Sequence, residues 1–115
     1  MKLDSFLQQL QNSPETIEFT DTMAVIEENY NFTETTFQNA ELINEAGQNS
    51  GSCKLFAFAQ LQNLPEELTL ACFGAYYRDD VLKNPDAADH QNIRNFIKNG
   101  WSGINFSASP LQGKN

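Results

Sequence analysis

The side chains best suited to covalent or acid–base chemistry in this sequence are two cysteines and a single histidine. Cys53 follows a polar, glycine-containing stretch and begins a dense apolar run, which predicts that it lies in the first turn of a helix. Free backbone N–H groups and the positive end of the helix dipole stabilise a thiolate there. His90, with Asn92 or Asp89 as a third group, would complete the ingredients of a thiol-dependent hydrolase or transferase. The alternative is that Cys53 is a small buried hydrophobic residue, because free cysteines are usually buried.

Further polar side chains could orient a ligand if the fold brought them to one cleft with Cys53 and His90. This requires the helix start that carries Cys53 to face the helix start that carries His90. Tyr76 is predicted on a buried helix stripe, with Tyr77 and Arg78 pointing elsewhere. The alternative is a buried hydrogen-bond network that binds no ligand. The candidate ligand-binding residues are Asn44, Glu45, Gln48, Asn49, Tyr77, Arg78 and Arg94.

The spacing of potential ligands argues against other kinds of site. Cys53 and Cys72 form no C-x-x-C pair and the chain has no H-x-x-x-H pair, so we expect no metal and two reduced thiols. No Gly-Lys-Ser/Thr follows Gly51, so a phosphate-binding loop is absent and we expect no cofactor. The net charge is -8 and the seven basic residues are scattered, which predicts no binding to nucleic acid or to anionic membranes.

Length and composition predict one folded domain over residues 1–115. The hydrophobic content of 40% and the nine Phe residues favour a packed core over disorder. No apolar run approaches the roughly 20 residues needed to span a bilayer, and the N-terminus lacks the pattern of a secretory signal peptide. We therefore expect a soluble protein of the cytoplasm.

Apolar spacing predicts five helices, over about residues 3–12, 20–30, 54–62, 65–82 and 90–99. The last helix should bury Trp101 with Ile93, Phe96 and Ile97. The Thr- and Phe-rich segment between the second and third helices predicts strands over about residues 35–39 and 41–44, and a further strand is expected near residues 103–107. Residues 109–115 are predicted to form a frayed tail. The result is an α+β fold, mostly helical with a small two- or three-stranded antiparallel sheet; an all-α fold is the alternative.

Three stretches of the chain resemble a known family. They are AGQNSGSCKLFAF, FGAYYRDDVL, and DHQNIRNF followed by GW. Together they are similar to the HopJ family, named after type III effector proteins of plant-pathogenic pseudomonads. The resemblance extends from about Leu3 to about Phe106. It implies a bacterial protein that is secreted through a type III system or stays in the bacterial cytoplasm, and it implies no catalytic residues.

The sequence therefore predicts an effector-like interaction domain that binds a protein partner or a small ligand. A small enzyme using Cys53 and His90 is one alternative, and a cytoplasmic accessory or regulatory protein is another. Convergence of Cys53 and His90 in a cleft would favour the enzyme, whereas a polar cleft with Cys53 buried would favour binding.

Overall fold

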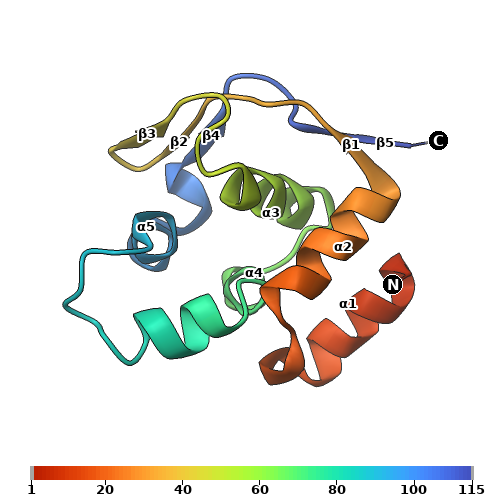
Figure 1. The fold of residues 1–115 in the computed structure, drawn as a ribbon, viewed down its shortest axis with the longest axis horizontal. Helices are drawn as coiled ribbons and strands as arrows, with labels where there is room; N and C mark the ends of the chain where they lie inside the picture. The colour runs from red at the N-terminus through yellow and green to blue at the C-terminus, as the bar shows by residue number, and fades with distance from the viewer. Residues whose placement is uncertain (1, 115) are drawn as a thin grey trace.

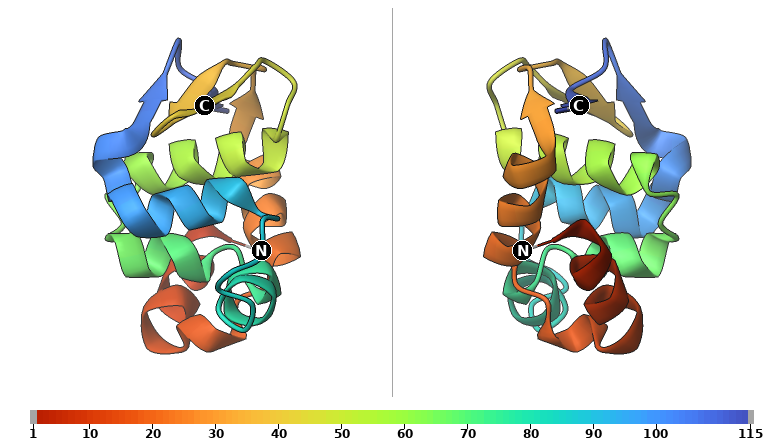
Figure 2. Two further views of the ribbon diagram at one scale, coloured as in Figure 1. Left: turned by 90° about the vertical axis from the view of Figure 1, so that its left-hand side faces the viewer. Right: turned by 90° about the vertical axis from the view of Figure 1, so that its right-hand side faces the viewer.

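Helix α3 (Ser50–Leu61) lies at the centre of the computed structural model, which describes residues 2–114. The strands cover one side of α3, and the other helices surround its remaining sides (Figures 1 and 2). Six of its residues are buried, on more than one face, because the helix is contacted on several sides at once. The surrounding helices are α1 (Leu3–Asn12), α2 (Phe19–Asn29), α4 (Glu66–Ala71) and α5 (Gln91–Asn99).

The strands form two small antiparallel sheets at one end of the molecule (Figure 1). In the first sheet, β2 (Phe37–Asn39) lies between β3 (Leu42–Asn44) and β4 (Ile104–Phe106). The predicted hairpin and the predicted third strand are therefore confirmed, with the tight turn at Ala40 in the left-handed region at φ 57°. The fold is α+β, as predicted, and the all-α alternative is wrong.

The second sheet corrects the prediction of a frayed C-terminal tail. Strand β5 (Leu111–Gly113) pairs with β1 (Tyr30–Phe32), which follows α2 directly. The sequence did not predict β1, because the helical spacing of apolar residues continues to Tyr30. Leu111 is buried in the hydrophobic core, so the segment is held by side-chain packing as well as by the backbone ladder. Residues 111–113 are thus an integral strand rather than part of a frayed tail.

The predicted helix over residues 65–82 is also interrupted. Helix α4 ends at Ala71, and a π-helical segment, η2 (Tyr76–Val81), follows after a turn. Gly74 lies in that turn with φ 63°, and a Cβ there would lie 2.7 Å from the backbone nitrogen of Phe19. Only glycine allows both this conformation and this close approach to the start of α2.

The new direction of η2 reverses the expected roles of the two tyrosines. Tyr76 is 45% exposed, whereas Tyr77 packs against the core. Trp101 lies in the 3-10 turn η3 (Gly100–Gly103), where it is half-buried and packs edge-on against Phe96 at the edge of the core rather than inside it. Ile97 is 46% exposed and does not belong to the core. The remaining 3-10 turn, η1 (Pro14–Thr16), connects α1 to α2.

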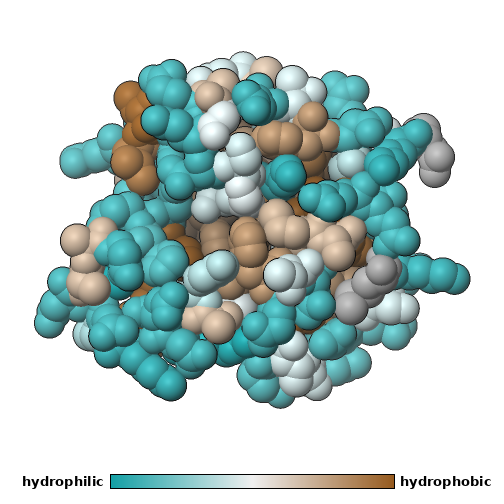
Figure 3. Space-filling model, in the orientation of Figure 1, coloured by the Kyte–Doolittle hydropathy of each residue, from teal (hydrophilic) through white to brown (hydrophobic). Residues whose placement is uncertain are grey.

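Apolar surface is visible at the centre of the face shown in Figure 3, surrounded by polar side chains. In the matching view of Figure 1, α3, α5 and α2 surround this region. The apolar surface therefore lies where three elements distant in sequence approach one another.

Candidate functional site

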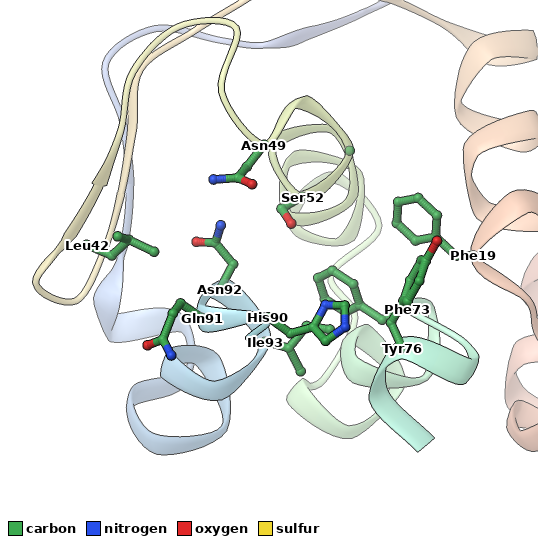
Figure 4. A pocket seen from close by; sticks show the side chains of 11 residues that line it. Phe19, Leu42, Asn49, Ser52, Phe73, Tyr76, His90, Gln91, Asn92 and Ile93 are labelled. Carbon is green, nitrogen blue, oxygen red and sulfur yellow. The ribbon is translucent and has the colours of Figure 1, made fainter. Parts of the chain in front are cut away.

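A pocket of about 630 Å³ lies where the start of α3 faces the start of α5 (Figure 4). Two of its walls are completed by the start of α2 and by the chain from Phe73 to η2. The apolar lining consists of Phe19, Leu42, Phe73, Tyr76 and Ile93. The polar lining consists of Asn49, Ser52, His90, Gln91 and Asn92, with Gly51 between the first two.

Both facing helices begin in the same unusual way. Their N-cap residues, Asn49 and His90, have left-handed backbone conformations with φ 51° and 52°. Neither side chain caps its helix, and among residues 2–114 no other side-chain oxygen accepts a hydrogen bond from the N–H groups of either first turn. Two sets of free donors, each at the positive end of a helix, therefore flank one pocket. The start of α3 thus faces the start of α5, which is the arrangement that we expected if the polar residues formed a functional cleft.

Hydrogen-bonded asparagine side chains lie behind the polar wall. Asn44 and Asn92 exchange amide hydrogen bonds, with Nδ2 to Oδ1 distances of 3.1 and 3.0 Å. Asn49 donates to Asn44 Oδ1 at 2.7 Å, and Asn39 donates to Asn92 Oδ1 at 3.1 Å. These bonds join the β2–β3 hairpin to α5 and fix the amides of Asn49 and Asn92 at the pocket. We call these four residues the asparagine network.

His90 is oriented by an acidic partner. Its Nε2 lies 3.1 Å from Oδ2 of Asp80 on η2, and its ring lies against Tyr76 with centroids 5.3 Å apart. The adjacent Asp89 pairs instead with Arg94, whose hydrogen bond lowers the pKa of the Asp89 carboxyl. Asp80, rather than Asp89 or Asn92, is therefore the group that holds the imidazole.

Cys53 is on the opposite side of the first turn of α3 and does not line the pocket. It is buried, and its Sγ–H points to the backbone oxygen of Thr35 at 3.8 Å. Burial raises the pKa of the Cys53 thiol to about 11, because the thiolate would lose its hydration. Burial likewise raises the pKa of Cys72 to about 12. Neither thiol has the electropositive, accessible surroundings of an activated cysteine.

Comparison with known proteins now adds the family. The family described as HopJ type III effector protein matches residues 3–111, from the start of α1 to the start of β5. The chain belongs to the HopJ family. It is also similar to the crystal structure of VPA0580, a protein of unknown function, with 56% sequence identity and a TM-score of 0.97. That match covers 99% of this chain and 95% of the other. Comparison with curated proteins gave no match.

The remaining predicted ligand residues of this HopJ protein do not reach the pocket. Arg78 donates to the backbone oxygen of Ile17 and pairs with Glu18, which ties η2 to the start of α2. Arg94 donates to the backbone oxygens of Asn84 and Pro85 and holds the loop before α5. Tyr77 packs on the core, and the side chain of Gln48 accepts a hydrogen bond from the backbone of Glu45. Asn44 acts through the asparagine network, so the predicted residues that line the site are Asn49, His90 and Asn92.

Sequence reasoning missed Ser52, Asp80, Gln91 and the aromatic wall as parts of this HopJ pocket. A signal for Ser52 was present, since it precedes Cys53 and successive helix residues point about 100° apart. No local signal identifies Asp80, because a π-helical segment changes which side chains share a face.

Over residues 2–114, no three His, Cys, Asp or Glu side chains lie together in a way that could hold a metal ion. Across the same residues, no helix is long and apolar enough to cross a membrane.

Proposed function

We propose that this HopJ family protein is a binding module for a small organic molecule that joins an aromatic or apolar body to a carboxylate or carbonyl oxygen. The observation that carries the proposal is the meeting of an aromatic wall and two uncapped helix starts in one pocket. A volume of about 630 Å³ lies within the usual range of small-molecule sites.

The apolar wall is suited to a flat hydrophobic group. Phe19 stacks on Phe73 with centroids 6.2 Å apart and meets Tyr76 edge-on at 5.3 Å, so the rings support one another. Tyr76 is 45% exposed. A bound aromatic ring would remove part of this surface from water, which is favourable.

The polar wall is suited to an oxygen atom that accepts hydrogen bonds. Its donors are the first-turn N–H groups of α3 and α5, which no side-chain cap satisfies. The protein carries a net charge of -8, but at physiological salt charges more than about 8 Å away are largely screened. The local donors therefore decide which group binds, and either a carboxylate or a neutral carbonyl satisfies them.

The concave shape of this site favours a small ligand over a flat protein surface. A protein partner is the second class of ligand that the sequence suggested. A partner could still use the pocket by inserting one side chain of the same chemistry, such as a C-terminal aromatic residue with its carboxylate.

Binding of 4-fluorobenzoate, followed by ¹⁹F NMR, tests the proposal. We expect saturable binding with a dissociation constant on the order of 1 mM, since so small a probe makes few contacts. Tyr76→Ala should weaken binding severalfold. Leu61→Ala is the matched control, because Leu61 is similarly exposed at 53% but lies outside the pocket. Equal loss in both variants, or no saturable binding, would contradict the proposal.

The family description suggests delivery of this protein through a type III system, and we include that delivery in the proposal. Helix α1 buries Phe6 and Leu10 completely, so export would require this helix to unfold. A reporter fused after Asn115 tests delivery. Its appearance in a recipient cell only when the type III apparatus is functional would support it, and retention in the bacterium would contradict it.

A further inference from the structure

The first turn of α3 does present a nucleophile to the pocket, but the nucleophile is Ser52 rather than Cys53. Ser52 and His90 both line the pocket, and Figure 4 shows the Ser52 hydroxyl pointing out from α3 and the His90 ring lying beside Tyr76 across the pocket. A serine hydroxyl is a weak nucleophile unless a base can take its proton. The question is therefore whether His90 is equipped to act as that base.

His90 has the partner that a general base needs. Asp80 Oδ2 lies 3.1 Å from Nε2. In the tautomer that donates from Nε2 to this carboxylate, Nδ1 is the ring nitrogen that can accept a proton. In familiar Ser-His-Asp sites Nδ1 bonds the aspartate and Nε2 takes the serine proton, so the two ring nitrogens are exchanged here. The imidazole still links a carboxylate to a hydroxyl. The left-handed backbone of His90, at φ 52°, places its ring at the pocket. A residue held in such a conformation is common at functional sites.

The start of α3 supplies the third requirement, which is stabilisation of negative charge. An ester carbonyl attacked by a serine develops an oxyanion, and backbone N–H groups at a helix start stabilise it. The first-turn N–H groups of α3 have no side-chain cap and belong to the same turn as Ser52. The nucleophile and the oxyanion donors are thus adjacent.

We propose that Ser52, His90 and Asp80 form an acyl-transfer site that cleaves small carboxylic esters with an aromatic acyl or alcohol group. Ser52 Oγ attacks the carbonyl carbon while its proton passes to His90 Nδ1. The ester C–O bond then breaks, and the leaving alcohol takes that proton. Water attacks the acyl-serine in turn, giving its proton to Nδ1, and the acid leaves as the proton returns to Oγ. The Asp80 carboxylate acts through His90 and does not line the pocket, so Asp80 is a positioning residue.

This inference rests on the proposed binding function, because the ester must occupy the same pocket. Reaction with p-nitrophenyl acetate, read by nitrophenolate release and by mass spectrometry of the peptides, tests it. We expect an acetyl group on Ser52. Ser52→Ala should lower the rate at least about 100-fold, whereas Ser50→Ala, in the same turn but outside the pocket lining, should change it less than about twofold.

Asp80→Asn separates positioning from binding. It should slow acetylation at least about tenfold while leaving the affinity for 4-fluorobenzoate within about twofold. Absence of acetyl-Ser52 from the wild-type protein would by itself overturn the inference. An unchanged rate in a folded Ser52→Ala protein would overturn it as well. If 4-fluorobenzoate still binds in that case, the reaction is refuted and the binding function stands. Acetyl-Ser52 without saturable 4-fluorobenzoate binding would support the reaction and refute the proposed ligand class.

Discussion

Ser52 and Cys53 are neighbours on α3, yet the helix places them in opposite environments. Cys53 is 1% exposed and faces the core beneath Thr35, and burial raises its pKa to about 11. Ser52 is partly exposed and lines the pocket opposite His90. A rotation of about 100° per residue is enough to divide the first turn into a scaffold side and a pocket side. A side chain at a helix start is therefore not reactive for that reason alone. The side chain must also face space that solvent or a ligand can reach.

The scaffold side continues along α3 into the aromatic core. Phe56 is completely buried and its ring meets those of Phe73, Phe96 and Trp101, with centroid distances between 5.0 and 6.3 Å. The pocket side instead contacts polar side chains held by the asparagine network. We expect substitutions on the scaffold side to change stability, and those on the pocket side to change binding.

The largest effect should follow Phe56→Ala. The change removes a ring that several elements pack against, so the free energy of unfolding should fall by about 3–5 kcal/mol. Urea unfolding followed by circular dichroism measures it. A loss below about 1 kcal/mol would show that α3 is not the centre of the core.

Asn92→Ala should have the next largest effect. It removes the buried side-chain acceptor that Asn39 and Asn44 share, while Asn39 keeps the backbone oxygen of residue 92 and Asn44 keeps that of Phe37, so we expect a cost of about 1–3 kcal/mol. Asn105→Ala, at an exposed position on β4, is the control and should cost much less. Similar costs for both variants would mean that the asparagine network does not join the hairpin to α5.

High pH should destabilise the protein through the two buried thiols. The pKa values of both thiols are raised on folding, so the unfolded chain releases these protons first, and stability is lost as the pH rises from about 8.5 through about 11 for Cys53 and about 12 for Cys72. At pH 10 the loss should be about 2 kcal/mol for each thiol. The Cys53→Ala/Cys72→Ala protein should lack this part of the decline. An identical decline in both proteins would show that the thiols are already accessible in the folded state.

Ser52→Ala should have the smallest effect on folding, a change within about 0.5 kcal/mol, because the side chain faces the pocket. Cys53→Ala is the matched comparison at the next residue and should cost more, since it opens a small cavity in the core. Thermal unfolding of the two variants side by side gives the difference. The reverse order would contradict the division of the first turn into two sides.

The sequence predicted elements best where the signal was local. Periodicity located α1, α2, α3 and α5, and the Thr- and Phe-rich segment located the β2–β3 hairpin. The sequence did not predict β1 and β5, because these paired strands are separated by most of the chain and no short turn joins them. It also failed at Gly74, whose left-handed turn depends on the close approach of Phe19. Long-range packing decided both cases.

For the candidate site, too, the sequence predicted what local patterns determine and missed what long-range packing determines. Polar loops before two helices pointed to Asn49 and His90, which do line the pocket, because turn-to-helix junctions can be read locally. The choice between Ser52 and Cys53 depended on where α3 begins, and boundaries are the least reliable part of such predictions. Asp80 required the π-helical form of η2, which no pattern in the sequence announced.

The central claim is that the two facing helix starts form one binding site. Titration of the ¹⁵N-labelled protein with 4-fluorobenzoate tests it most directly, through the backbone amide signals of residues 50–52 and 91–93. We predict that both groups shift together along one saturation curve, while the amides around Leu61 do not move. Shifts at a single helix start, shifts only around Leu61, or no saturable shift at either start would contradict the account.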